Sequence, residues 1–151
     1  MNNGHPHDIT VFDITRHAAP APGAGIHIEV ATPATLRHAI QCARFTFTTD
    51  ATAVDRFVSI SLWLATAEQI RFFAPRAQPA NTAWDYCFVP NATSANGIAD
   101  LANRIMCHVS PEVIIPNCAF LIAEADGMVA GDVFSASIWY YRSWVQGTIQ
   151  P

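Results

Sequence analysis

The sequence contains no lysine: its eight basic residues are all arginines, and no two of them are adjacent. Charged residues make up only 13% of the chain, against a usual share of roughly 25%. Without a basic run, and with a net charge of −4, the chain is not expected to carry a nucleic-acid-binding tail, although a local arginine patch can still form in the fold. Arginine in place of lysine favours ion pairs at protein interfaces, because the planar guanidinium is weakly hydrated and can bind a partner through two hydrogen bonds. A GC-rich genome gives the same residue usage without any such role. Because 51% of the residues are hydrophobic, we expect part of the surface to be covered in an assembly.

Cysteine is sparse and widely spaced. The four cysteines form no C-x-x-C pair, and no histidine stands beside them at a spacing suited to zinc. Each lies in an apolar or strand-like run, so we expect reduced core thiols in preference to disulfides at Cys42, Cys87, Cys107 and Cys118. A metal corner at His5, His7 and Asp8 is a weaker hypothesis than a polar tail that becomes ordered on a neighbour.

Enzyme motifs and long apolar runs are missing as well. The sequence has no G-x-S-x-G, H-E-x-x-H or P-loop motif, and GIHIEV offers only His27 and Glu29 where a cupin needs a larger metal set. The candidate acids Asp85, Glu124 and Asp132 lie in separate segments, and Asp132 is expected to accept backbone N–H bonds in a turn. We therefore expect no enzyme activity and no cofactor. No membrane span or signal peptide is predicted, so the protein is expected to be soluble and made in a cytoplasm.

Glycine and proline clusters divide the chain into short runs in which apolar and polar side chains alternate, as in half-buried strands. Residues 36–49 and 57–64 are predicted to be antiparallel partners across a turn, with Phe47, Ile60 and Phe88 facing the core. No amphipathic helix is predicted. We expect an all-β fold, a two-sheet antiparallel jelly-roll sandwich of about eight strands. The predicted strands are residues 25–30, 36–49, 57–64, 71–75, 82–89, 104–110, 118–125 and 132–145.

The two ends of the chain supply candidate interface residues. Residues 1–20 are predicted to be an arm with a flexible link that docks on a neighbouring protein through Val11, Phe12 and Ile14, or else the first strand of the chain's own sheet; residues 21–151 form the jelly-roll domain. In the last strand we expect Tyr140 to face the core with Phe134 and Ile138. An outward surface for a neighbouring subunit or a sugar is predicted for Trp139, Tyr141 and Trp144.

Three phrases carry a resemblance: FTFTTDATAVDR followed by FVSISLWL, then APRAQPANTAWDYCFVPN, then IIPNCAFLIAEADGMVAGDVFSASIWYYRSW. In this order they resemble the small jelly-roll proteins encoded among the virion genes of tailed bacteriophages, over roughly residues 24 to 145. SLWLA, CFVPNA and PNCAFLI are also similar, more weakly, to coat proteins of tymovirus-like small RNA viruses. Residues 1–20 have no counterpart in the first family.

The resemblance to phage proteins implies a non-catalytic virion protein, with the cement proteins that clamp phage heads as the nearest functional analogy. It implies that the partners are other copies of the chain, with trimers as the expected oligomer, and a major capsid or other virion protein, without direct nucleic-acid or membrane binding. The chain would then reside in a virion assembled in a host cytoplasm. The alternatives are a self-assembling coat protein of a small icosahedral virus, and a carbohydrate-binding module associated with a tail.

Overall fold

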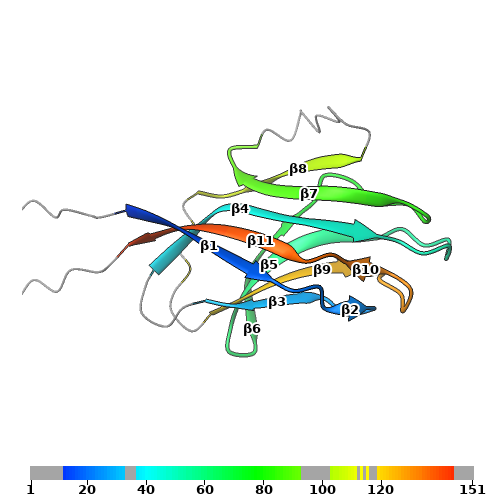
Figure 1. The fold of residues 1–151 in the computed structure, drawn as a ribbon, viewed down its shortest axis with the longest axis horizontal. Coiled ribbons are helices and arrows are strands. Elements are labelled where there is room, and N and C mark those ends of the chain that lie inside the picture. The colour runs from blue at the N-terminus through cyan, green and yellow to red at the C-terminus, as the bar shows by residue number, and fades with distance from the viewer. Residues whose placement is uncertain are drawn as a thin grey trace, which may run out of the picture.

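Two β-sheets make up the fold. The computed structural model describes residues 12–32, 37–92, 103–111, 113, 115 and 119–144, which form strands and no helix (Figure 1). No helix of this part of the chain is long and apolar enough to cross a membrane. The strands are β1 (Phe12–Ala19), β2 (Gly23–Ala24), β3 (Ile28–Ala31), β4 (Arg37–Thr48), β5 (Phe57–Leu64), β6 (Ala67–Phe73), β7 (Ala83–Pro90), β8 (Arg104–Val109), β9 (Ala119–Asp126), β10 (Val133–Phe134) and β11 (Ser137–Trp144).

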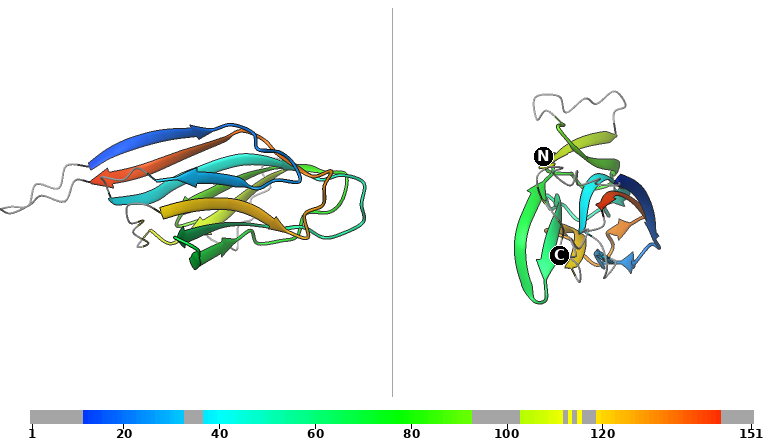
Figure 2. Two further views of the ribbon diagram at one scale, coloured as in Figure 1. Left: turned by 90° about the horizontal axis from the view of Figure 1, so that it is seen from below. Right: turned by 90° about the vertical axis from the view of Figure 1, so that its left-hand side faces the viewer.

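The sheets lie face to face as two layers (Figure 2). The seven-stranded sheet runs β1-β11-β4-β7-β8, and the short strands β10 and β2 continue it beside the end of β4. The four-stranded sheet has the order β3-β9-β5-β6. Neighbouring strands are antiparallel except β7 and β8, which run parallel. The strand orders show that most neighbours in both sheets are distant in the sequence, such as β1 and β11 or β3 and β9.

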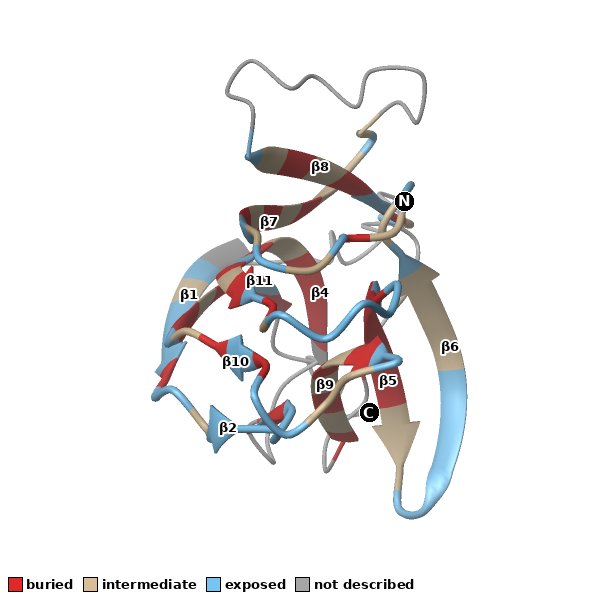
Figure 3. Cartoon of the chain, turned by 90° about the vertical axis from the view of Figure 1, so that its right-hand side faces the viewer, coloured by how far each residue is buried: buried red, intermediate tan, exposed pale blue. Residues whose placement is uncertain are grey.

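The core lies between the two layers. Along β9, buried side chains alternate with half-buried ones, as expected for a strand with one face against a core (Figure 3). Phe47, Ile60 and Phe88 are 0%, 1% and 0% exposed, so their predicted inward orientation is confirmed. An aromatic cluster surrounds Phe45, whose ring packs against those of Tyr86, Phe88 and Phe134.

The predicted all-β sandwich without helix is confirmed for the described residues, but the strand count differs. The run predicted as one strand over residues 132–145 breaks into β10 and β11. At the break, the Ser135 side chain accepts a hydrogen bond from the Thr46 N–H, while the Ser135 N–H donates to the Thr46 carbonyl. The described residues contain eleven strands in place of about eight, since β1, β2 and β10 add to the predicted runs.

The predicted pairing of residues 36–49 with residues 57–64 is wrong. Strand β4 belongs to the seven-stranded sheet, whereas β5 pairs with β6 and β9 in the other sheet. The connection between them crosses from one layer to the other, and its last residue, Arg56, bridges to Gln78 by two backbone hydrogen bonds. A run of alternating residues specifies a strand, but the partner depends on where the loop is anchored.

The N-terminal strand belongs to the chain's own sheet. Strand β1 pairs with β11 along its whole length, from Phe12 opposite Trp144 to Ala19 opposite Ser137. Of the two predicted alternatives for the N-terminal segment, residues 12–19 therefore follow the second: they form the first strand of the chain's own sheet and not an arm that docks on a neighbour. The link that follows is tied to the body, because the Gly25 N–H donates to the Asp132 carbonyl. Residues 1–11, including Val11 and the His5, His7 and Asp8 corner, lie outside the described residues.

Candidate docking surfaces and the buried ion pair

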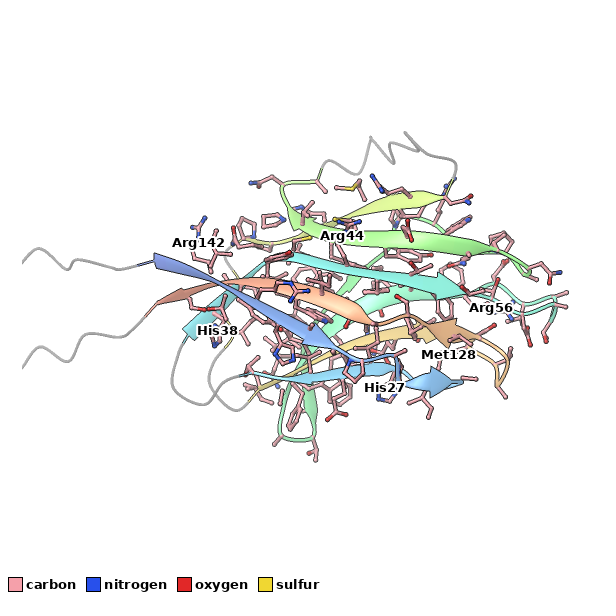
Figure 4. All side chains as sticks on the ribbon, viewed as in Figure 1. His27, His38, Arg44, Arg56, Met128 and Arg142 are labelled. Atoms are coloured by element: carbon pink, nitrogen blue, oxygen red, sulfur yellow. The ribbon has the colours of Figure 1, made fainter. Side chains whose placement is uncertain are left out.

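A buried ion pair closes one end of the sandwich. The side chains of Arg56 and Asp132 are both 0% exposed, and the guanidinium donates two hydrogen bonds of 3.0 Å to the two carboxylate oxygens. The same guanidinium donates to a carboxylate oxygen of Asp50 at 2.8 Å and to the carbonyls of Thr52 and Val54. Figure 4 labels Arg56 in this region, close to the loops that join the two layers.

Asp132 also accepts the backbone N–H groups of Asp50 and Val129, so the predicted role in a turn is confirmed. Burial by itself would raise the pKa of Asp132, but the Arg56 guanidinium and these two N–H groups outweigh it and lower the pKa. The pKa of Arg56 is raised, first by its hydrogen bonds to Asp132. Because these groups satisfy one another, we assign the cluster a structural role.

The predicted outward orientation of Trp139 and Tyr141 is wrong. Both side chains are buried in the core, at 0% and 1% exposure, while Tyr140 is half-buried on the opposite face. The cause is the break between β10 and β11: Phe134 faces the core, and two residues outside the strands shift the alternation by one position before Ser137. The indole N–H of Trp139 donates to the Ser137 hydroxyl, so it needs no external partner.

Among the remaining candidate interface residues, the structure describes the side chain of Ile14 alone. Ile14, on β1, is 66% exposed. The backbones of Phe12 and Trp144 pair with each other, but their side chains lie outside the described part of the structure. Of the six predicted interface positions, only Ile14 is therefore seen as an exposed apolar side chain.

Arginines gather on the outer face of the seven-stranded sheet. In β4, Arg44 is exposed between the buried residues Ala43 and Phe45, so it points away from the core. Paired residues of neighbouring strands lie on the same face. Arg44 is paired with Cys87 and with Ile138, and Arg16 is paired with Tyr140. We call this the arginine face; its described charged residues are Arg16, Arg44, Arg104, Arg142 and the carboxylate Asp85.

Three guanidinium groups of the arginine face are not neutralised within the described part of the chain. No described carboxylate forms an ion pair with Arg16, Arg44 or Arg104. Arg142 lies on the same face beside Gln41, and Figure 4 labels it with Arg44. The sequence left open whether a local arginine patch forms. The signal that could have located it is the position of each arginine at an outward-facing site of an alternating strand, as for Arg44 between Ala43 and Phe45.

A shallow hollow of about 220 Å³ lies beside Arg44. Ligand pockets are usually about 300–1,000 Å³, so this hollow is small. Apart from Arg44, polar groups of its lining are bonded internally: the Thr46 hydroxyl donates to Asp85 at 2.6 Å, and the Ser135 hydroxyl donates to the Ala136 carbonyl at 2.7 Å. The hollow therefore offers little to a small-molecule ligand.

The outer face of the four-stranded sheet has the opposite charge. Arg71 forms ion pairs with three carboxylates across this face, a close pair with Glu68 and pairs of 3.0 and 3.4 Å with Glu124 and Asp126. Glu29 adds a further exposed carboxylate on β3. Two aromatic side chains stand among these charges: Phe57 is 47% exposed and Phe73 is 54% exposed. We call this the acidic face, with the residues Glu29, Phe57, Glu68, Arg71, Phe73, Glu124 and Asp126.

Two of the cysteines lie on the arginine face and not in the core. The sulfurs of Cys42 and Cys87 are 3.6 Å apart, and both residues are half-buried. Cys107 is buried as predicted, and burial raises the pKa of its thiol. All three are free thiols, and Cys118 lies outside the described residues. The described part of the chain contains no group of three or more His, Cys, Asp or Glu residues able to hold a metal.

In comparisons with known protein families and with curated proteins, no family model and no curated protein sequence matches this chain.

Proposed function

We propose that the chain is a non-catalytic virion structural protein of jelly-roll type, a capsid-stabilising cement protein that associates with its own copies and binds a capsid surface. The strand order supports the jelly-roll assignment. Without the two-residue strands β2 and β10 and the parallel strand β8, the sheets read β1-β11-β4-β7 and β3-β9-β5-β6. If these eight strands are numbered 1 to 8 in chain order, the two sheets have the orders 1-8-3-6 and 2-7-4-5. This is the strand order of a jelly roll, which is made of two Greek keys.

The observation that carries the docking role is the opposite charge of the two outer faces. Among the described residues, the arginine face has four guanidinium groups and one carboxylate, and the acidic face has four carboxylates and one guanidinium. Such surfaces attract each other and repel copies of themselves, which fixes the orientation of association. Phe57 and Phe73 add exposed apolar area to the acidic face, and contact with a neighbouring protein would remove this area from water.

Contact between unlike faces is heterologous: each copy uses one face for one neighbour and the other face for the next. Trimers remain our expected oligomer, on the resemblance to phage proteins. The capsid is then the second partner, in a virion assembled in the host cytoplasm. The glycan-binding alternative loses two of its three aromatic residues, because Trp139 and Tyr141 are buried; the third is Trp144.

Light scattering of the purified chain at micromolar concentration tests the association. We expect a small oligomer at low salt that dissociates as ionic strength rises, because the Debye length falls to about 8 Å at physiological salt. Arg44→Glu and Glu29→Arg should each weaken association about tenfold, equivalent to about 1.4 kcal/mol. Mixing the two variants should restore it, since each then offers a face complementary to the other. Arg76→Glu in the β6–β7 loop is the control and should leave association unchanged.

Binding to particles is measured separately, with capsids assembled from the virus that encodes the chain. A cement protein should sediment with these capsids and raise the temperature at which they release their contents. A strict monomer that neither self-associates nor binds capsids would overturn the proposal. Closed shells formed by the chain alone, seen by negative-stain electron microscopy, would favour the small-virus coat protein instead.

A further inference from the structure

Cys42 and Cys87 form the most reactive arrangement of side chains among the described residues. They lie on the adjacent strands β4 and β7, with sulfurs 3.6 Å apart, and neither thiol is buried deeply enough to exclude a small oxidant. In the register, Arg44 is opposite Cys87, so Cys42 is the diagonal neighbour of Cys87 two residues along β4. Reactive thiols combine access with a neighbouring positive charge, and this pair has both.

The two thiols have different roles because their surroundings differ. The Cys42 thiol donates a hydrogen bond that favours the thiolate of Cys87, and the nearby guanidinium groups of Arg44 and Arg104 act in the same direction. Together they lower the pKa of Cys87 to about 7, while the same hydrogen bond and burial raise the pKa of Cys42. Arg44 lies opposite Cys87, and Arg104 lies on β8, the other neighbour of β7, so we assign Cys87 as the nucleophile and Cys42 as the thiol that attacks second.

We propose that Cys42 and Cys87 form a reversible disulfide, a redox-sensitive site on the arginine face, with a peroxide as the oxidant. The Cys87 thiolate attacks one oxygen of hydrogen peroxide, and the O–O bond breaks. The leaving hydroxide takes a proton and becomes water, which leaves Cys87 as a sulfenic acid. The Cys42 thiol then loses its proton and attacks the Cys87 sulfur, the S–O bond breaks, and a second water leaves. Two thiols are oxidised, and one peroxide is reduced to two waters.

The geometry requires a small movement. The sulfurs must approach from 3.6 Å to a bond length of about 2.05 Å. Both sulfurs already lie on the same face of one sheet, but diagonal neighbours are about 7–8 Å apart, so the bond needs a shift of β4 against β7 as well as rotation of the two side chains. The disulfide would join β4 to β7 and remove the thiolate between Arg44 and Arg104, leaving the arginine face more positive. This inference is independent of the proposed virion role.

The test treats the full-length reduced chain with one equivalent of hydrogen peroxide at pH 7.5 and counts thiols before and after. We expect the loss of two of the four thiols, an intact mass lower by two hydrogen atoms, and a peptide map that links Cys42 to Cys87. Dithiothreitol should restore both thiols. Cys107→Ser should form the same disulfide, whereas Cys42→Ser should accumulate a sulfenic acid at Cys87 that dimedone traps.

Four thiols remaining after oxidation would overturn the proposal. So would a disulfide that includes Cys107 or Cys118, or one that joins two chains. A sulfenic acid trapped at Cys42 in the Cys87→Ser variant, at the rate seen for Cys87 in Cys42→Ser, would overturn the assignment of the nucleophile. Because none of these readouts involves capsids or association, they stand apart from the tests of the proposed function.

Discussion

Replacing Asp132 with alanine should remove a large part of the stability of the fold. The substitution leaves the Arg56 guanidinium, which is fully buried, with Asp50 as its only remaining carboxylate partner. Removing one partner of a buried ion pair costs about 3–5 kcal/mol. The Arg56 charge stays in the interior with Asp50 and the carbonyls of Thr52 and Val54 as its remaining acceptors. The N–H groups of Asp50 and Val129 lose their acceptor as well. We expect a loss of about 3–5 kcal/mol, against a total stability of about 5–15 kcal/mol for a typical domain.

Urea unfolding followed by tryptophan fluorescence measures this loss, because Trp84 and Trp139 are buried in the native state. Asp132→Asn keeps one acceptor oxygen and the side-chain shape, so it should cost less than Asp132→Ala. The exposed Asp55 is the control: Asp55→Ala should change stability by no more than about 0.5 kcal/mol. The double variant Arg56→Met/Asp132→Leu should recover much of the loss, because apolar groups of similar volume leave no buried charge.

The ion pair of Arg56 and Asp132 should also make the free energy of unfolding fall at acid pH. The pKa of Asp132 is lowered in the folded protein, whereas the unfolded chain should titrate near the ordinary aspartate value of about 3.9. Its contribution to stability is therefore fully present above that value and is lost as the pH falls through the lower folded pKa. Asp132→Asn should make the free energy of unfolding less dependent on pH in this acid range, because the amide does not titrate there. An Asp132→Ala variant that unfolds within about 1 kcal/mol of wild type, at any pH above 5, would refute the account of the ion pair.

Three further predictions concern packing and the first strand. Gly131→Ala should lower the melting temperature, because a Cβ atom there would lie 2.3 Å from a carboxylate oxygen of Asp50. Phe47→Ala should cost about 3–5 kcal/mol and Ile60→Ala about 2–5 kcal/mol in urea unfolding, since both side chains are fully buried. Deleting residues 1–20 should lower the stability of the isolated chain, because β1 pairs with β11 along its length; an unchanged melting temperature would contradict this pairing.

The sequence predicted the strands better than their pairing. Alternation of apolar and polar residues is a local signal: it located β5, β7 and β9, and it gave the correct inward orientation of Ile60 on β5 and Phe88 on β7. It failed over residues 132–145, because a backbone break at Ser135 changes the phase and no apolar residue marks the change. It failed again for β4 and β5, because the choice of sheet depends on loop anchoring by Arg56 and its distant partner Asp132.

The candidate surfaces could be predicted only in part. Scattered arginines become one face because strands distant in the sequence lie side by side, and single-strand patterns do not give that order. The same is true of Cys42 and Cys87, which are 45 residues apart in the sequence and 3.6 Å apart in space. Asp132 was the exception: its position beside a glycine in a turn was enough to predict that it accepts backbone N–H bonds.

The pairing of β1 with β11 also constrains how the chain can fold during synthesis. The hydroxyls of Thr15 and Ser143, one on each strand, lie 3.2 Å apart although the two residues are 128 positions apart in the sequence. At ribosomal rates of about 5–20 residues per second, the first strand emerges roughly ten seconds before its partner. Throughout that time the growing chain holds an unpaired strand, and no intermediate length can complete the seven-stranded sheet. Closure of the sandwich must therefore wait until β11 has emerged, which makes the nascent protein dependent on rapid final pairing or on chaperones that cover the unpaired strand.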